Sequence, residues 1–322
     1  MLRRQLLLAM AGGAATLATP LAFSQNRFPT RPISLIVPFA AGGGGDTTAR
    51  LLAKGVADKF DSPVVVDNRA GASGNIGAAY VMRSAPDGYT LLSLSSTYGI
   101  QAAVGKPGFD AVNDMQPIIL ASSEPLVLVV HPSAPWRDAR DLALAAQKAP
   151  GTFSHGSAGI GSIAHLGMEE LAYTMKASFL HVPYKGSSSA MTDLLGGTVH
   201  LVLSTATFLS PYVKTGKVRA LGVSGSKRLA ALPGVPTFDE QGFPYDVFDW
   251  KAVAGPKGMP PDVVARLNKA FNDVLANPDV TARLEADGSS VVGGTPERLA
   301  STLQADIERW KSLVKKASIR LE

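Results

Sequence analysis

The sequence predicts an α/β protein in which two α/β halves, joined by two crossover segments, enclose a cleft. One observation behind this is that short β-branched segments alternate with helix-forming segments, an order typical of a mostly parallel sheet. Another is an approximate repeat, in which a strand, a glycine-rich turn and a helix occur at residues 33–54 and again at 153–174. Strand-like crossover segments at 125–130 and 250–254 separate the halves. We therefore expect one domain at 25–125 plus 247–322 and a second at 126–246.

The first 24 residues have the composition of an export signal. Arg3 and Arg4 precede an apolar run at residues 6–22, and the small side chains of Ala22 and Ser24 mark a cleavage site. The paired arginines are a feature of the twin-arginine route, and the general export route is the alternative. No later segment has the roughly 20 unbroken apolar residues of a membrane span. We therefore expect a soluble protein of the periplasm.

The composition is that of a globular protein, with 46% hydrophobic and 18% charged residues among 322. A chain of this length can bury the core of one large domain or of two smaller ones. The formal net charge is +5, and the basic residues are scattered, which argues against a nucleic-acid partner. The chain has no cysteine, which excludes disulfides, cysteine nucleophiles and thiolate metal sites.

The first half opens with the segment that is most informative about function. Residues 32–37 predict a buried strand, residues 37–46 read VPFAAGGGGD, and residues 47–54 predict a helix that Asp46 is placed to cap. A strand, a glycine turn and a helix start direct backbone N–H groups and the positive helix end at one point, where an anion can bind. The alternative is an ordinary turn whose glycines only relieve steric strain.

The remaining elements follow in order. In the first half we expect strands at 63–67 and 89–94, a polar loop at 68–75 that opens a helix near residue 76, and a hydroxyl-rich loop at 95–99. In the second half we expect strands at 153–155, 179–184, 199–203 and 218–223, helices at 163–174 and 190–195, and a rigid loop at 232–237. Two helices, at 261–276 and 296–317, complete the chain.

Nine short strings occur in a fixed order over nearly the whole mature chain. They are RPI at 31–33, VPFAAGG at 37–43 with Asp46 after it, NRAGA at 68–72, PDGYT at 86–90, GSAGIGS at 156–162, VPYKG at 182–186, LLGG at 194–197, GKVRAL at 216–221 and LPGVPT at 232–237. In this order they resemble the solute-binding proteins of tripartite tricarboxylate transporters, the TctC or Bug family. Asp67, where Glu is more usual, and residues 108–110, where a Tyr-Asp pair is usual, depart from the family pattern.

The resemblance implies a type II periplasmic-binding-protein-like fold that closes on a small organic carboxylate. It also implies a monomeric receptor that works without catalysis, cofactor or metal and delivers its ligand to a membrane permease. Delivery to a signalling partner is the alternative.

The resemblance also implies a binding site in which backbone N–H groups at two facing helix starts hold the ligand carboxylate. In the first domain it maps onto Phe39, Ala41, Gly42, Gly45 and Asp46, and in the second onto Ser157, Gly159, Gly161, Ser162 and His165. Charge-assisted hydrogen bonds of this kind contribute roughly 1.5–3 kcal/mol each. Asp46 is equally well explained as a helix cap, because its charge would repel a bound carboxylate.

Several further residues are candidates by position. Ser95, Ser96 and Thr97 end a strand at the edge of the sheet where α/β proteins bind ligands, as do Ser204 and Thr205. Tyr184 and Lys185 are candidates for the wall of the cleft. We expect structural roles for Trp250, as a packed core or hinge residue, and for the other histidines, His131, His155, His181 and His200, which lack metal-ligand spacing.

Two enzymatic alternatives have weaker support. A periplasmic serine hydrolase would need the nucleophile string G-x-S-x-G, which does not occur in the chain. A nucleotide-binding enzyme would use the glycines at 42–45, but these match neither G-x-G-x-x-G nor the P-loop, which also requires a lysine.

Overall fold

The computed structural model describes residues 28–105 and 108–317, so the predicted signal peptide at 1–24 lies outside the described residues. The chain divides into the residues up to Thr30 and a compact unit that begins at Arg31. All helices and strands described below belong to the second unit. Within the described ranges, no helix is both long enough and apolar enough to cross a membrane.

Strands of the described chain pair in the order β2-β1-β3-β9-β4-β7-β5-β6, and β8 and β10 pair with β4 outside this path. One part of this sheet, with the helices packed on it, is called lobe 1 below. Its parallel strands are β1 (Ile33–Val37), β2 (Val64–Asn68) and β3 (Thr90–Ser95). Its antiparallel strands are β9 (Phe248–Pro256), β10 (Ser290–Val291) and the first part of β4 (Met115–Val130).

The other part of the sheet, with its helices, is called lobe 2. Its parallel strands are β5 (Ser154–Ser157), β6 (Leu180–Pro183) and β7 (Leu201–Thr205). The second part of β4 runs antiparallel to β7 and to β8 (Arg219–Val223). The sheet is therefore mixed, because each lobe combines three parallel strands with antiparallel ones, and the expectation of a mostly parallel sheet is wrong.

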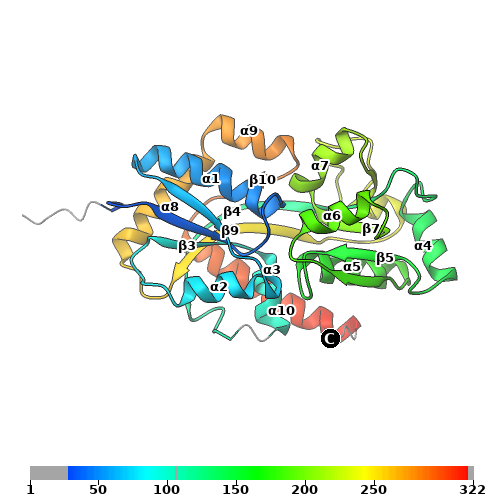
Figure 1. The fold of residues 1–322 in the computed structure, drawn as a ribbon, viewed down its shortest axis with the longest axis horizontal. Helices are drawn as coiled ribbons and strands as arrows, with labels where there is room; N and C mark the ends of the chain where they lie inside the picture. Colours follow the sequence, from blue (N-terminus) through cyan, green and yellow to red (C-terminus); the bar gives the residue numbers. More distant parts are fainter. Residues whose placement is uncertain (1–27, 106–107, 318–322) are drawn as a thin grey trace, which may run out of the picture. The chain divides into compact units, whose positions relative to one another are not determined.

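Strand β4 belongs to both lobes and changes partners between Pro125 and Leu126. Up to Pro125 it pairs with β9, and from Leu126 onwards it pairs with β7 and β8. Proline has no N–H to donate to a ladder, so it is tolerated where a strand leaves its partner. Figure 1 shows β4 and β9 running side by side towards lobe 2. The change of partner marks the point in β4 where lobe 1 ends and lobe 2 begins.

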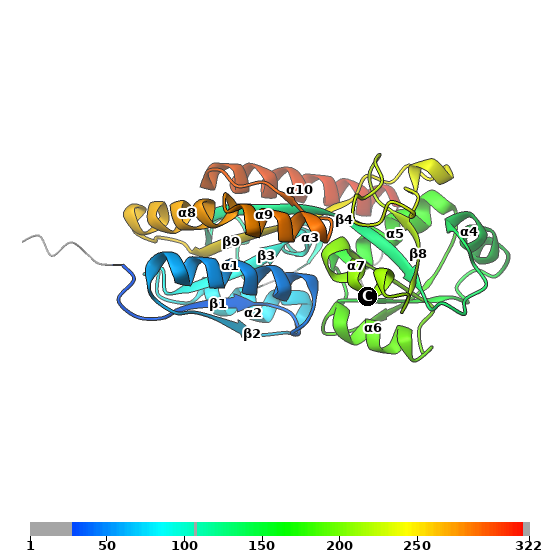
Figure 2. The same ribbon diagram turned by 90° about the horizontal axis from the view of Figure 1, so that it is seen from above.

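Lobe 1 is covered by helices from both ends of the chain. They are α1 (Gly44–Phe60), a short 3₁₀ turn η1 (Ala72–Gly74), α2 (Asn75–Met82), α3 (Ser96–Val104), α8 (Pro261–Leu275), α9 (Pro278–Ala286) and α10 (Pro296–Ala317). Helices α1 and α8 lie side by side in Figure 2. The apolar stripe of α10, with Leu299, Leu303 and Ile307, packs on a core that includes Trp250, as expected for that tryptophan.

Lobe 2 is covered by α4 (Ala139–Lys148), α5 (Ile163–Met175), α6 (Ser187–Leu195) and α7 (Ala206–Lys214). Its core joins apolar side chains of β4 and β7 with those of α4 and α5. The same core buries Trp310 completely, so the far end of α10 packs against lobe 2.

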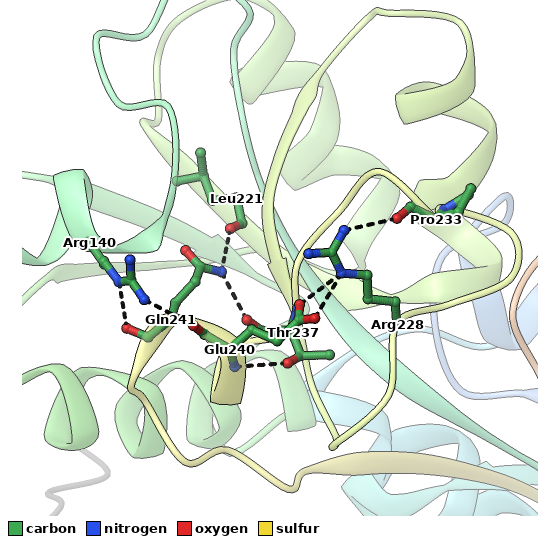
Figure 3. Close-up of polar contacts among 7 residues, drawn as sticks. All are labelled: Arg140, Leu221, Arg228, Pro233, Thr237, Glu240 and Gln241. Carbon is green, nitrogen blue, oxygen red and sulfur yellow. Dashed lines mark hydrogen bonds and ion pairs between the residues drawn. The ribbon is translucent and has the colours of Figure 1, made fainter.

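A polar network fastens the proline-rich loop that leads back to β9 (Figure 3). Thr237 and Glu240 bond reciprocally at the start of η2 (Asp239–Gln241), because each side chain accepts from the backbone N–H of the other, which is the capping-box arrangement. Arg228 donates to both carboxylate oxygens of Glu240, and the side-chain amide of Gln241 donates to the carbonyl of Leu221 in β8. The loop is therefore held against lobe 2.

Three expectations about local structure are corrected. The hydroxyl-rich segment at 95–99 is not a loop: Ser95 is the N-cap of α3, and helix α3 begins at Ser96. Helices α4, α7 and α9 lie in segments where the sequence predicted none. Asp46 does not cap α1, because the N-cap is Gly43 and Asp46 lies inside the first turn.

Candidate functional site

A cavity lies between the two lobes and is lined by both. The volume that is open to the centres of water-sized atoms is about 60 Å³. One water molecule needs ~10–15 Å³ on this measure, so the cavity suits a small solute. Lobe 1 contributes the end of β1, the start of α1 and the end of β3, and lobe 2 contributes the start of α5 and the end of β7. The lining residues are Val37, Pro38, Phe39, Ala40, Gly43, Gly44, Gly45, Asp46, Ser93, Leu94, Ser95, Thr97, Ala158, Ile163, Ala164, Ser187, Ser204, Thr205, Asp249 and Lys251.

The start of α1 presents free backbone donors to this cavity. The first N–H groups of a helix have no intrahelical acceptor, and in the described chain those of Gly44, Gly45 and Asp46 receive no acceptor from elsewhere. Gly42, with φ of +82°, turns the chain from β1 into the helix in a conformation that favours glycine. Three N–H groups and the positive helix end therefore meet the cavity.

Asp46 braces this turn from inside the helix. Its carboxylate accepts from the Gly42 N–H (2.9 Å), from Arg50 Nε (2.9 Å) and from Asn68 Nδ2 (2.9 Å). Burial by itself would raise the pKa of Asp46, but the hydrogen bonds from Arg50, Gly42 and Asn68 outweigh it and lower the pKa below the ordinary value. Asp46 is therefore an ionised, fully engaged carboxylate.

The start of α1 also touches lobe 2. A side chain at Gly44 would overlap Thr205 Oγ1, the hydroxyl at the end of β7. Thr205 is 5% exposed, and in the described chain its hydroxyl has no hydrogen-bond partner. The absence of a side chain at position 44 therefore allows the start of α1 to lie this close to the end of β7.

The start of α5 has a different hydrogen-bond pattern. Ser162 is the N-cap, and its hydroxyl accepts from the His165 N–H (3.2 Å). The Gly159 N–H donates to Ser157 Oγ (3.0 Å), and the Gly161 N–H donates to His165 Nδ1 (3.0 Å). The Ile163 N–H donates to Thr97 Oγ1 of lobe 1 (3.0 Å). In the described residues this leaves the N–H of Ala164, which lines the cavity, as the first-turn donor without an acceptor.

Three histidine rings support the α5 loop from behind. His165 stacks on His181 with ring centroids 3.7 Å apart, and His155 lies 4.9 Å from His181. Burial lowers the pKa of His165 to about 4 and that of His181 to about 3. The rings of His165 and His181 are therefore neutral near pH 7. This leaves His165 Nδ1 free to accept from Gly161, while His181 Nε2 lies 2.6 Å from Ser157 Oγ.

Charged side chains of the crossing strands lie beside the cavity. Lys251 of β9 forms ion pairs with Asp249 of the same strand and with Glu124 of β4, the latter at 3.4 Å. Asp249 also accepts from the N–H and the hydroxyl of Ser96, and Glu124 accepts from the Thr207 N–H at the start of α7. All three charged groups are buried. Burial would lower the pKa of Lys251, but Asp249 and Glu124 raise it above the ordinary value, so the ammonium stays charged.

The structure brings some of the predicted site residues to the cavity and places others behind it. Those that line it are Phe39, Gly45, Asp46, Ser95, Thr97, Ser204 and Thr205. Tyr184, Gly159 and Lys185 line a neighbouring surface pocket with Phe39. The other predicted residues lie outside the lining and support the residues that form it. They are Ala41, Gly42, Ser96, Ser157, Gly161, Ser162 and His165.

Sequence reasoning missed Gly44, Ala164, Asp249 and Lys251. The signal available for the last two was a pair of charged residues inside an apolar return strand, since charged residues are rarely buried without a role or a partner.

Hydrogen bonds join the two lobes around the cavity. Gln101 Nε2 of α3 donates to the carbonyls of Ile160 and Gly161 (3.1 Å each), and Ser188 Oγ of α6 donates to the carbonyl of Ala41 (3.1 Å). The Ala40 N–H donates to the carbonyl of Lys185 (3.4 Å). The lobes are therefore in contact on both sides of the cavity.

Comparisons with known proteins identify the family. Residues 48–319 match the tripartite tricarboxylate transporter family receptor. The chain is 39% identical over 311 residues to a UPF0065 protein from the tcbD-tcbE intergenic region of Pseudomonas sp., covering 95% of this chain and 92% of that one. It is 36% identical to Protein BugT of Bordetella pertussis, covering 98% of each. The chain therefore belongs to the tripartite tricarboxylate transporter receptor family, as the motif order predicted.

Solved structures agree with this assignment. The periplasmic binding protein BugD has a TM-score of 0.88 and 34% identity, covering 91% of this chain and 99% of its own. Rpa4515 of R. palustris, solved with adipate, has a TM-score of 0.87 and 33% identity, covering 91% and 99%. MatC of Rhodopseudomonas palustris, solved with bound malate, has a TM-score of 0.85 and 31% identity, covering 89% and 100%. The chain is thus a periplasmic-type solute-binding protein and not an enzyme.

Proposed function

We propose that this receptor captures a small organic carboxylate in the cavity between its lobes and delivers it to the permease of a tripartite tricarboxylate-type transporter. The observation that carries the proposal is the set of unpartnered backbone N–H groups of Gly44, Gly45 and Asp46 at the start of α1, joined across the cavity by that of Ala164. Oriented N–H groups at a helix N-terminus are a binding site for an anion. The adipate and malate in two related structures support a carboxylate as the anion.

The cavity favours a carboxylate over a larger or neutral solute for two reasons. Its space is small, and its free donors are grouped at helix ends where negative charge is stabilised. Closure of the lobes removes water from these donors, and hydrogen bonds to a charged acceptor are the stronger kind. In this proposal Asp46 takes no part in direct contact with the anion, since its oxygens are already engaged by lobe 1.

Calorimetric titration of the mature protein with mono-, di- and tricarboxylates tests the binding step. A carboxylate introduced by Gly45→Asp would occupy the anion position, because nothing lies within 4 Å of a side-chain carbon built there. We expect this variant to fold and to lose binding. Gly234→Asp is the matched control, since Gly234 is exposed, has equally open surroundings and lies away from the cavity.

Absence of binding across all three acid classes would contradict the proposal, as would full affinity in Gly45→Asp. The delivery step is tested separately by uptake of the identified acid in cells that contain the permease, with and without the receptor. Uptake that does not depend on the receptor would contradict delivery while leaving the binding step intact.

A further inference from the structure

The charges around the cavity do not match those of a dicarboxylate. Among the residues that line the cavity in the described chain, Lys251 is the one that carries a cationic side chain, and Asp46 and Asp249 carry carboxylates. Asp46 is balanced by Arg50 within lobe 1. Lys251 is shared between Asp249 and Glu124, so this buried cluster has one more negative charge than positive.

Lys251 is not free to take a ligand carboxylate. Its ammonium is held by two carboxylates from two strands, in the register that pairs Glu124 with Asp249. Moving it to a ligand would leave two buried carboxylates without their counter-ion, and an uncompensated buried charge is strongly unfavourable. A second ligand carboxylate near this cluster would therefore meet an excess of negative charge.

The lining of the cavity also contains hydrogen-bond acceptors. Thr205, 5% exposed, lines the cavity with an unpartnered hydroxyl oxygen. Asp249 lines it with a carboxylate whose second oxygen contacts Lys251, and a carboxylate oxygen accepts more than one hydrogen bond. Ser204 and Ser187, whose hydroxyls bond each other at 3.0 Å, also line the cavity. A group that donates hydrogen bonds, and best a cation, complements this surface.

Resting on the proposed function, we infer that the ligand has one carboxylate, held at the start of α1, and at its other end a nitrogen that donates hydrogen bonds, an ammonium or an amide. Asp249 is then the residue that selects such a ligand over a dicarboxylate of the same length. The ligand class differs in this respect from the adipate and malate found in the related structures.

Calorimetry with matched probes tests the inference. For chains of four to six carbons, each dicarboxylate is compared with its half-amide and with the ω-amino acid of the same length. We expect the wild-type protein to bind the nitrogen-bearing member of at least one set about tenfold more tightly than its partner, the contribution of one charge-assisted hydrogen bond. If the dicarboxylate binds more tightly than its nitrogen-bearing partners in every set that binds, the inference is overturned and the proposed function stands. If no probe binds, both are overturned.

The residue assignment is tested by Asp249→Asn, which removes the charge but keeps an oxygen that accepts from Ser96. It also leaves Lys251 and Glu124 as a neutral pair. We expect this variant to lose the preference for the nitrogen-bearing probe, and an unchanged preference would overturn the role of Asp249. Asp87→Asn, which removes a charge from an exposed ion pair with Arg31, is the control. If Asp249→Asn does not fold, the wild-type comparison still decides the ligand class, and trimethylation of the best amine, which removes its donors, must then abolish the preference.

Discussion

The two helix starts that face the cavity have the same sequence signature but use their backbone N–H groups differently. At the start of α1 the N-cap is Gly43, which has no side chain to cap with, and the first N–H groups stay free. At the start of α5 the N-cap is Ser162, and the N–H groups of Gly161, Ile163 and His165 are accepted by side chains. A glycine-rich turn before a helix therefore makes donors available only when no nearby side chain accepts from them.

The difference suggests a division of work between the lobes. In the proposed function, the start of α1 in lobe 1 supplies three of the N–H groups that hold the anion, and lobe 2 supplies that of Ala164, beside a loop shaped by buried histidines. The Ile163 N–H of lobe 2 donates to Thr97 of lobe 1. This donor therefore holds the lobes together and is not available to the ligand.

The largest effect is expected from pH acting on lobe 2. The pKa of His165 is about 4, lowered mainly by burial and partly by His155 and opposed by Glu169, whereas an unfolded histidine titrates near 6.5. Between these values the unfolded chain binds more protons, so the stability that is present above pH 6.5 falls as pH falls, by about 3 kcal/mol down to pH 4. His181, with a pKa of about 3, acts in the same direction. Chemical denaturation at pH 7, 5.5 and 4 measures the slope.

The variant His165→Phe keeps a ring but removes the titrating group. We expect a shallower dependence of the free energy of unfolding on pH in this variant than in the wild type. The turn before α1 should not respond in this range, since the lowered pKa of Asp46 keeps that carboxylate ionised above pH 4. An equal slope in wild type and His165→Phe would contradict the assignment of the effect to His165.

An intermediate effect is expected where the lobes meet at α1. In Gly44→Ala the new methyl group overlaps Thr205 Oγ1, and overpacking of this kind costs about 1–3 kcal/mol. Because the overlap exists only when the lobes are in contact, we expect ligand affinity to fall by roughly one to two orders of magnitude, with little change in the stability of lobe 1. Calorimetry with the tightest carboxylate measures this.

The neighbouring position provides the control. Gly45→Ala meets nothing within 4 Å and should keep most of the affinity. The second change Thr205→Ala should restore binding to Gly44→Ala, because it removes the overlapping hydroxyl. Failure of this rescue would mean that Gly44 acts through the backbone of α1 and not through contact with lobe 2.

The sequence was sufficient where local chemistry decides the structure. The strand and glycine turn before α1, the strand that begins at Ser154 and the helix that begins at Ile163 follow from propensity and turn residues. It was insufficient where the decisive partner is distant. Helix α3 reads as a hydroxyl-rich loop, but Ser96 is fixed by Asp249, 153 positions away.

The same limit applies to the site. The glycines of both turns could be located from the sequence, because turn chemistry is local. The cluster of Glu124, Asp249 and Lys251 could not, because it exists only through the antiparallel register of β4 and β9. The role of His165 depends in the same way on His181, which reaches it from the neighbouring strand β6.

The smallest effect, and the most direct comparison of the two helix starts, is expected from Gly43→Ser. This change gives α1 the kind of N-cap that α5 already has, and the extended backbone of Gly43 (φ −80°, ψ 169°) suits serine. Serine in place of glycine at an N-cap should raise the free energy of unfolding by only a few tenths of a kcal/mol. Its hydroxyl would accept from the Gly45 or Asp46 N–H, so we expect weaker carboxylate binding in a protein that is slightly more stable. Unchanged affinity in a correctly folded Gly43→Ser variant would mean that these N–H groups do not hold the ligand, and the contrast between the two helix starts would then have no bearing on binding.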